Sequence, residues 1–264
     1  MGFWSVIGAG WRGAFGAIKA NWPLFGLLIL VNTVLEAAVE LIAPLHFVAR
    51  IGPSGHTMMH IAMAPLMLHF RSVVLSAVFS LVTAPCMVMV HRHILLSEDN
   101  KVFTDLKRLT FFGSLIFGVK FALIGLPRIA RTVITSATTG VAHSLLLTGF
   151  WLLYLPAIWL LIRLVPTYPA AALDVPNPLV TGWRRSAGHW WYIASVMSLG
   201  MAPVVIAFYA LPMAVAYSST PERAERLFKM GVATACVVGP FYIAVGAALA
   251  SELFRKFGGV PAQS

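Results

Sequence analysis

Charged residues are scarce in this chain, and acidic residues are the scarcest. Asp, Glu, Lys and Arg make up 11% of the 264 residues, whereas soluble domains contain about 25%. The nine acidic residues are outnumbered by 19 Lys and Arg, so the formal net charge is +10. So few charges cannot cover the surface of an ordinary water-soluble domain, and the composition argues against that class.

Cysteine is also nearly absent. The two cysteines lie inside apolar runs and lack Cys-x-x-Cys spacing, which argues against a disulfide framework and a thiolate zinc site. Two histidine pairs, His56 with His60 and His91 with His93, have no carboxylate or Cys beside them. Because zinc needs three or four convergent ligands, we expect no metal site, and no other cofactor is indicated.

Long apolar runs are abundant instead. Hydrophobic residues make up 59% of the chain, and several runs approach the ~20 residues that cross a ~30 Å hydrocarbon core as a helix. The runs are continuous, whereas the strands of a membrane barrel alternate. The sequence therefore predicts an all-α fold, a polytopic membrane helix bundle with about six transmembrane helices. Residues 1–264 are expected to form a single transmembrane domain with spans at residues 24–45, 72–90, 109–126, 144–162, 191–217 and 231–250.

The basic residues lie mainly between these runs. With six spans, the side that holds both termini carries the larger share of Lys and Arg. By the positive-inside rule, both termini of this multi-pass membrane protein are expected in the cytoplasm. Basic residues that flank spans are explained by orientation and by contact with anionic lipid, so no nucleic-acid partner is expected.

Three of the basic segments run into aromatic residues at the start of an expected span. They extend from Trp11 to Trp22, from Lys107 to Phe112 and from Trp183 to Trp191. Aromatic and basic residues are typical of the membrane–water boundary, and we expect short interfacial helices at these places. A helical hairpin repeated three times would give the same pattern, and that alternative stays open.

Polar residues also occur where lipid is expected. Asn32, Glu36 and Glu40 follow one another at four-residue spacing in the first expected span and therefore share one helix face. Intramembrane carboxylates are costly and usually pair with a cation or line a polar path. Lys120 in the third expected span lies at a matching depth, so we predict a Glu36–Lys120 ion pair. A structural pair and a proton or substrate pathway both remain open.

The most distinctive stretch extends from Arg163 to Tyr192. It contains PAAALD at residues 169–174 and GWRRSAGHWW at residues 182–191. This order resembles the membrane domain attached to some bacterial glycerophosphodiester phosphodiesterases and the related stand-alone inner-membrane proteins of the YciC-like type. The turn HRHILLSE at residues 91–98 is similar to a second recurrent segment of that family. The chain departs from the pattern at Ala187, where a second Arg is usual, and at Tyr192, which replaces a basic residue.

This resemblance implies an architecture and no activity. The stand-alone members have no assigned activity, and no counterpart of the attached phosphodiesterase domain is found in these residues. We therefore expect a non-enzymatic scaffold, lipid-contacting protein or accessory subunit, without catalytic residues. Membrane lipids, including anionic ones, are the expected partners, and a protein partner or a second copy is also considered. The candidate contact residues for headgroups or a partner are Arg163, Trp183, Arg184, Arg185, Trp190 and Trp191.

Two other functions are considered. The first is a small-solute or proton-coupled transporter that uses the Glu36 and Glu40 face. The second is an intramembrane enzyme, because PSGHT at residues 53–57 resembles the central motif of phosphatidic-acid-type phosphatases. The upstream Lys/Arg motif and the downstream nucleophilic His motif of that family are missing, which argues against the enzyme.

Overall fold

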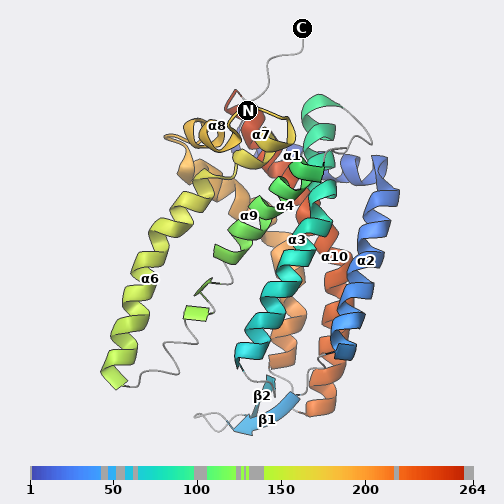
Figure 1. Cartoon of the computed structure of the whole chain (residues 1–264), viewed down its shortest axis with the longest axis vertical. Helices are drawn as coiled ribbons and strands as arrows, with labels where there is room; N and C mark the ends of the chain where they lie inside the picture. The colour runs from blue at the N-terminus through green and yellow to red at the C-terminus, as the bar shows by residue number, and fades with distance from the viewer. Residues whose placement is uncertain are drawn as a thin grey trace.

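The computed structural model describes residues 2–42, 47–51, 57–61, 65–97, 106–122, 126–127, 129–130, 140–216 and 220–258 (Figure 1). The described chain is dominated by helices, which confirms the predicted helical architecture. These are α1 (Phe3–Ala20), α2 (Trp22–Ile42), α3 (Pro65–Leu96), α4 (Leu106–Lys120), α6 (Gly140–Arg163), α7 (Thr167–Ala172), α8 (Pro178–Arg185), α9 (Trp190–Ala216) and α10 (Pro221–Lys256).

A short β-hairpin connects α2 and α3. Strands β1 (Phe47–Ile51) and β2 (Thr57–Ile61) pair antiparallel, with Phe47 opposite Ile61. The predicted all-α fold includes no strand between the spans expected at residues 24–45 and 72–90, because five-residue strands are too short to give a clear alternating pattern. The PSGHT motif falls mostly between the strands, and residues 52–56 lie outside the described part of the chain.

Five of the described helices are long and apolar enough to cross a membrane. Their apolar segments are Trp22–Val39, Ala77–Leu96, Ser144–Arg163, Trp190–Ala207 and Glu225–Lys256. They coincide with five of the six expected spans. The remaining one, expected at residues 109–126, corresponds to α4, whose apolar stretch Thr110–Val119 is shorter. Ten helical residues extend about 15 Å, which is half of the hydrocarbon core.

The helix ends gather at two sides of the molecule (Figure 1). The start of α2, the start of α9 and the ends of α3, α6 and α10 lie at the side that carries α1, α7 and α8. The hairpin and the start of α6 lie at the opposite side. Both α1 and the end of α10 are therefore on the same side of the protein.

Helix α10 is the centre of the bundle and packs against α9, α1, α3 and α2. Leu249 of α10 lies against Gly10 of α1 and Gly200 of α9. A Cβ atom at these glycines would lie 2.6 and 2.7 Å from the Leu249 side chain. Glycine is thus required at both contacts, because it lets neighbouring helices approach closely. The buried residues around this point include Val6, Ala14, Val90, Ile193, Ala248 and Leu253.

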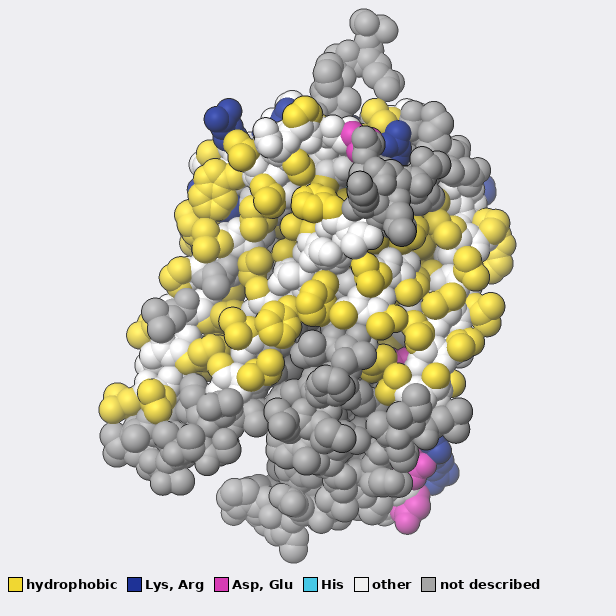
Figure 2. Space-filling view, in the orientation of Figure 1, with side chains coloured by type: hydrophobic (Ala, Val, Ile, Leu, Met, Phe, Trp, Pro, Cys, Tyr) yellow, Lys and Arg dark blue, Asp and Glu magenta, His cyan; other side chains and the backbone are white. Residues whose placement is uncertain are grey.

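The charged side chains are separated from the apolar surface. Figure 2 shows hydrophobic side chains over the middle of the visible face and charged side chains near its two ends. Arg184, Arg185, Arg255 and Lys256 belong to the α7–α8 side, whereas Glu222, Arg223, Glu225 and Lys229 start α10 at the opposite side. An apolar belt between two charged ends is the surface that a bilayer requires.

Candidate functional site

Helices α7 and α8 form a compact layer over the ends of the long helices. Prolines at 166, 169, 176 and 178 prevent one continuous helix here, so the chain forms two short ones. Between them Asp174 and Asn177 adopt left-handed backbone angles, with φ of 58° and 51°. Gly182 of α8 lies directly on Thr167 of α7, since a Cβ atom at Gly182 would be 2.7 Å from the Thr167 nitrogen.

Arg163 joins this layer to α6. Its Nη2 donates to the Trp183 carbonyl at 2.9 Å, and its Nε donates to Ser186 Oγ at 3.3 Å. The guanidinium also lies 3.7 Å from the Trp183 ring centroid and 5.2 Å from that of Trp159. These contacts link α6 to α8, and the expectation that Arg163 contacts headgroups or a partner stays a prediction.

Arg92 joins the same layer to α3. Its Nη1 donates to the Ala172 carbonyl at 3.3 Å and lies 3.8 Å from Asp174 Oδ2. Tyr168 of α7 is partly buried next to Phe112 of α4, and desolvation raises the pKa of its hydroxyl above the ordinary value. The Tyr168 hydroxyl is therefore neutral. The layer formed by α7 and α8 is fixed to α3, α4 and α6, and Tyr168 adds no negative charge to it.

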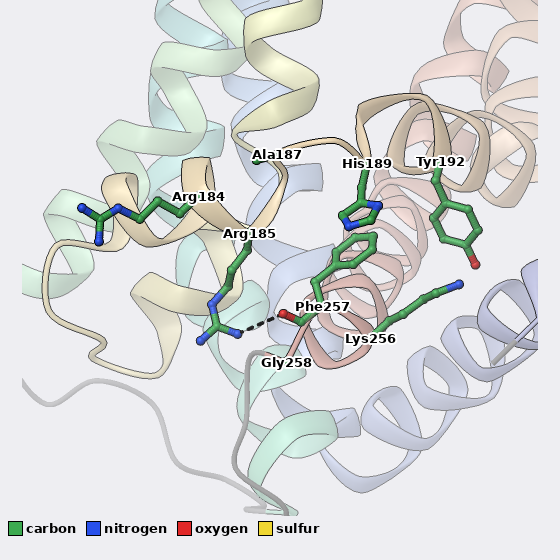
Figure 3. Close-up of a pocket in the computed structure, with 8 residues that line it drawn as sticks. All are labelled: Arg184, Arg185, Ala187, His189, Tyr192, Lys256, Phe257 and Gly258. Carbon is green, nitrogen blue, oxygen red and sulfur yellow. Dashed lines mark hydrogen bonds between the residues drawn. The ribbon is translucent and has the colours of Figure 1, made fainter.

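A basic pocket opens between α8, the start of α9 and the end of α10. It has a volume of about 840 Å³ and is lined by Arg184, Arg185, Ala187, His189, Tyr192, Lys256, Phe257 and Gly258. None of these eight residues carries a carboxylate. Figure 3 shows Arg185, His189, Lys256 and Phe257 around the pocket, whereas the Arg184 side chain points away from them.

Aromatic rings and one carbonyl hold the cations of this basic pocket. The Arg185 guanidinium lies 4.7 Å from the Phe254 ring centroid, and its Nη1 donates to the Phe257 carbonyl at 3.5 Å. Lys256 Nζ lies 3.8 Å from the Tyr192 ring centroid. The His189 and Phe257 rings stack with centroids 4.6 Å apart. Cation–π contacts attract the positive charge to the face of the ring rather than to a carboxylate, so the pocket keeps its positive charge.

The other predicted contact residues occupy different positions. Trp190 and Trp191 stack with ring centroids 3.9 Å apart, and Trp191 is 69% exposed. Trp183 is partly buried against Trp159 and Arg163. Sequence analysis missed the contribution of Lys256 and Phe257. Both residues are about 70 positions away from Arg185 in the chain, and for Phe257 the separation is 72 residues. No local sequence pattern therefore connects them with Arg185.

The polar face of α2 is only partly described. Asn32 is buried with 3% exposure, and neither its amide nitrogen nor its amide oxygen has a hydrogen-bond partner. Glu36 is half-buried near Cys236 of α10. The side chains of Glu40 and Lys120 lie outside the described part of the chain. The Glu36–Lys120 pair therefore stays a prediction. The two helices that carry these residues have one neighbour in common, because α4 packs against α3 and α7 and α2 packs against α10 and α3.

A buried polar cluster connects the ends of α3 and α10. The Glu252 side chain is 5% exposed and lies 3.2 Å from Arg255 Nη1. Arg255 also donates to the Ile94 carbonyl. His91 Nδ1 lies 2.7 Å from Ser251 Oγ, while His91 Nε2 is buried without a partner. These groups fix α10 to α3 beneath the α7–α8 layer.

Among the described residues, no group of three or more His, Cys, Asp or Glu side chains is arranged to hold a metal ion. Comparison of the chain with protein-family models, with curated proteins and with solved structures gave no match. The resemblance suggested by the stretch from Arg163 to Tyr192 therefore stays a prediction.

Proposed function

We propose that this chain is a multi-span membrane protein that binds anionic, phosphate-bearing lipid headgroups in the basic pocket. One observation carries the proposal: Arg185 and Lys256 line a single pocket with His189, and no described carboxylate lines it. Arg and Lys bind phosphate oxygens through charge-assisted hydrogen bonds. The role is that of a non-enzymatic lipid-contacting protein, and it agrees with the expectation from the sequence.

The position of the basic pocket supports this proposal. It lies at the ends of apolar helices, where headgroups meet the apolar belt of Figure 2. In this arrangement α1, α7 and α8 lie in the interface, with exposed Trp4, Phe15 and Trp191 among the lipid. The same end carries Arg12, Lys19, Arg92 and Arg163. By the positive-inside rule this supports our assignment of this end and both termini to the cytoplasmic side of a bacterial inner membrane.

The directions of the helices support six crossings. Helix α3 ends and α4 begins on the side of the basic pocket, whereas α6 begins on the opposite side (Figure 1). The chain therefore has to pass from one side to the other between Leu96 and Gly140. We assign the sixth crossing to α4 together with the residues that follow it.

The charge of the basic pocket selects among headgroups. A zwitterionic lipid brings an ammonium group, which would need an acceptor or a carboxylate. None of the described lining side chains carries a carboxylate, and the neutral acceptors there, the Tyr192 hydroxyl and the His189 ring, lie among cations. A headgroup with net negative charge has no such requirement, and each nearby cation contributes about 1 kcal/mol to its attraction. We therefore expect anionic headgroups to be preferred over zwitterionic ones.

The test measures lipid retention by the purified full chain. Protein in mild detergent is mixed with equal amounts of phosphatidylglycerol and phosphatidylcholine, and bound lipid is counted by native mass spectrometry. The wild-type protein should retain phosphatidylglycerol preferentially. The variant Arg185→Gln/Lys256→Gln should lose roughly tenfold or more in this preference, because two cations of about 1 kcal/mol each are removed.

The matched control is Arg223→Gln/Arg226→Gln, which removes two cations from the opposite end of α10. It should retain the wild-type preference. The proposal is wrong if the wild-type protein shows no preference, or if both double variants lose it equally.

A further inference from the structure

Phe257 holds two polar side chains of the basic pocket through different atoms. Its carbonyl accepts a hydrogen bond from Arg185 Nη1 at 3.5 Å, and its ring stacks on the His189 ring with centroids 4.6 Å apart and planes at 9°. Figure 3 shows both contacts. Arg185 ends α8, and His189 directly precedes α9. The two side chains therefore lie beside the same residue, where a single ligand can contact both.

The position of His189 is fixed by the backbone as well as by stacking. Its N–H donates to the Ser186 carbonyl at 3.1 Å, and its carbonyl accepts from the Ile193 N–H at 3.0 Å. Gly188, with φ of 74°, makes the turn that leads into α9, and glycine adopts this backbone conformation readily. A ring that is held in place before a ligand arrives loses little conformational entropy when it binds.

The His189 ring is also accessible. It is exposed, and within the described part of the chain its two nitrogens make no hydrogen bond. Stacking covers a face of the ring, whereas the nitrogens lie at its edge. Imidazole donates a hydrogen bond from one nitrogen when neutral and from both when protonated. The Tyr192 hydroxyl is buried, so a ligand in this pocket reaches the His189 ring first.

We propose that the basic pocket selects phosphate-bearing headgroups that also carry hydroxyl groups, with the phosphate at Arg185 and a hydroxyl at His189. This inference rests on the proposed function and names the class of headgroup, a polyol phosphate such as that of phosphatidylglycerol. A guanidinium has five donors that suit phosphate oxygens, and the described hydrogen bonds of Arg185 use one of them. The volume of about 840 Å³ is that of a pocket for a whole small molecule and leaves room for a polyol beside the phosphate.

The test compares phosphatidylglycerol with phosphatidylmethanol, a lipid that has the same phosphodiester charge and no hydroxyl in its headgroup. Equal amounts of both are added to the detergent-purified full chain, and bound lipid is counted by native mass spectrometry. The wild-type protein should retain phosphatidylglycerol roughly two- to tenfold better, which is the range expected for one hydrogen bond. His189→Phe keeps a ring that can stack on Phe257 but removes both nitrogens, so the two lipids should be retained equally.

Two further variants separate hydrogen bonding from folding. His189→Gln supplies a hydrogen-bonding group without an aromatic ring, so it should recover part of the preference that His189→Phe loses. A merely structural role of the stacked ring predicts no such recovery. The matched control is His143→Phe, the same change near the start of α6 on the opposite side of the protein. It should keep the wild-type preference, and melting temperatures show whether each variant is folded.

The outcomes distinguish this inference from the proposed function. The inference is wrong, and the proposed function still holds, if the wild-type protein retains the two lipids equally but prefers both to phosphatidylcholine. If neither lipid is preferred to phosphatidylcholine, both proposals are wrong. The inference is also overturned if folded His189→Phe keeps the preference or His143→Phe loses it. Displacement of the bound lipid by equimolar glycerol 3-phosphate would overturn a lipid as the source of the polyol phosphate.

Discussion

Helices α6 and α10 are both strongly apolar, yet they have different surroundings. Their mean hydropathies are 2.1 and 1.9, but 6% of the apolar segment of α6 is buried inside the protein, against 50% of that of α10. Helix α10 presents Gly239, Ala244, Ala248 and Ser251 to its neighbours, whereas α6 exposes Leu and Trp side chains. Small residues allow close packing between helices, whereas large apolar residues can face lipid without a loss of stability. Hydropathy therefore identifies a span without identifying its neighbours.

The largest effect is expected from the same substitution in the two helices. Leu253 of α10 is fully buried, and Leu152 of α6 is 64% exposed. Leu253→Ala should lower the free energy of unfolding by about 3 kcal/mol, because it leaves a cavity among packed helices. Leu152→Ala should change it by less than about 0.5 kcal/mol. Reversible unfolding in mixed detergent micelles measures both. Equal losses would contradict the difference between α6 and α10.

The second prediction concerns the two charged pairs of α10. Glu252 is buried beside Arg255, whereas Glu225 and Lys229 are exposed and 2.7 Å apart. Arg255→Gln leaves the Glu252 carboxylate buried without this partner and removes a donor to the Ile94 carbonyl. We expect a loss of about 2–3 kcal/mol, below the full value for a buried pair because Arg255 itself is 40% exposed. A loss below about 0.5 kcal/mol would show that the end of α10 is hydrated.

The third prediction concerns the polar contacts that attach α6 to the rest of the protein. Arg163 is its main described polar attachment, through the Trp183 carbonyl and Ser186. Arg163→Lys keeps the charge but loses the planar donor arrangement and the stacking on Trp183. It should cost about 1–2 kcal/mol in unfolding free energy and increase proteolysis near α8. Arg184→Lys on the exposed side of α8 is the control and should change neither quantity.

The smallest effect is expected at the start of α10. Lys229→Gln removes a solvent-exposed pair with Glu225. Such pairs contribute less than about 0.5 kcal/mol, and salt screens them further. Unfolding midpoints at low and high salt should therefore agree for the variant and the wild-type protein. A larger, salt-dependent loss would mean that this segment packs against other charged groups.

The sequence predicted the long helices well and their contacts poorly. Apolar runs are local, so the spans over α2, α3, α6, α9 and α10 follow from composition. The contacts of Arg163 do not follow from composition, because its partners Trp183 and Ser186 approach it only through the fold of α7 and α8. An Arg at the end of an apolar run has the same local sequence whether it binds lipid or a carbonyl.

The candidate sites were predicted to different extents for the same reason. Arg184 and Arg185 were identified because they are consecutive and next to tryptophan, but Lys256 approaches Arg185 only through the bundle. Asn32 and Glu36 were identified by their spacing. The packing of α2 against α10, which lies about 200 residues later in the chain, leaves no mark on the α2 sequence.

The contact of α1 with α9 and α10 has a consequence for synthesis. Trp11 Nε1 donates to the Gly200 carbonyl at 3.1 Å, across 189 residues of chain. At about 5–20 residues per second, a ribosome needs roughly 10 to 40 s to make that length. During this time the apolar face of α1, with Val6, Ala14 and Ala17, lacks its partners in α9 and α10, although α3 is already made. The packing of α1 is thus completed only when α9 and α10 follow, and a nascent chain that lacks α10 leaves part of this face uncovered.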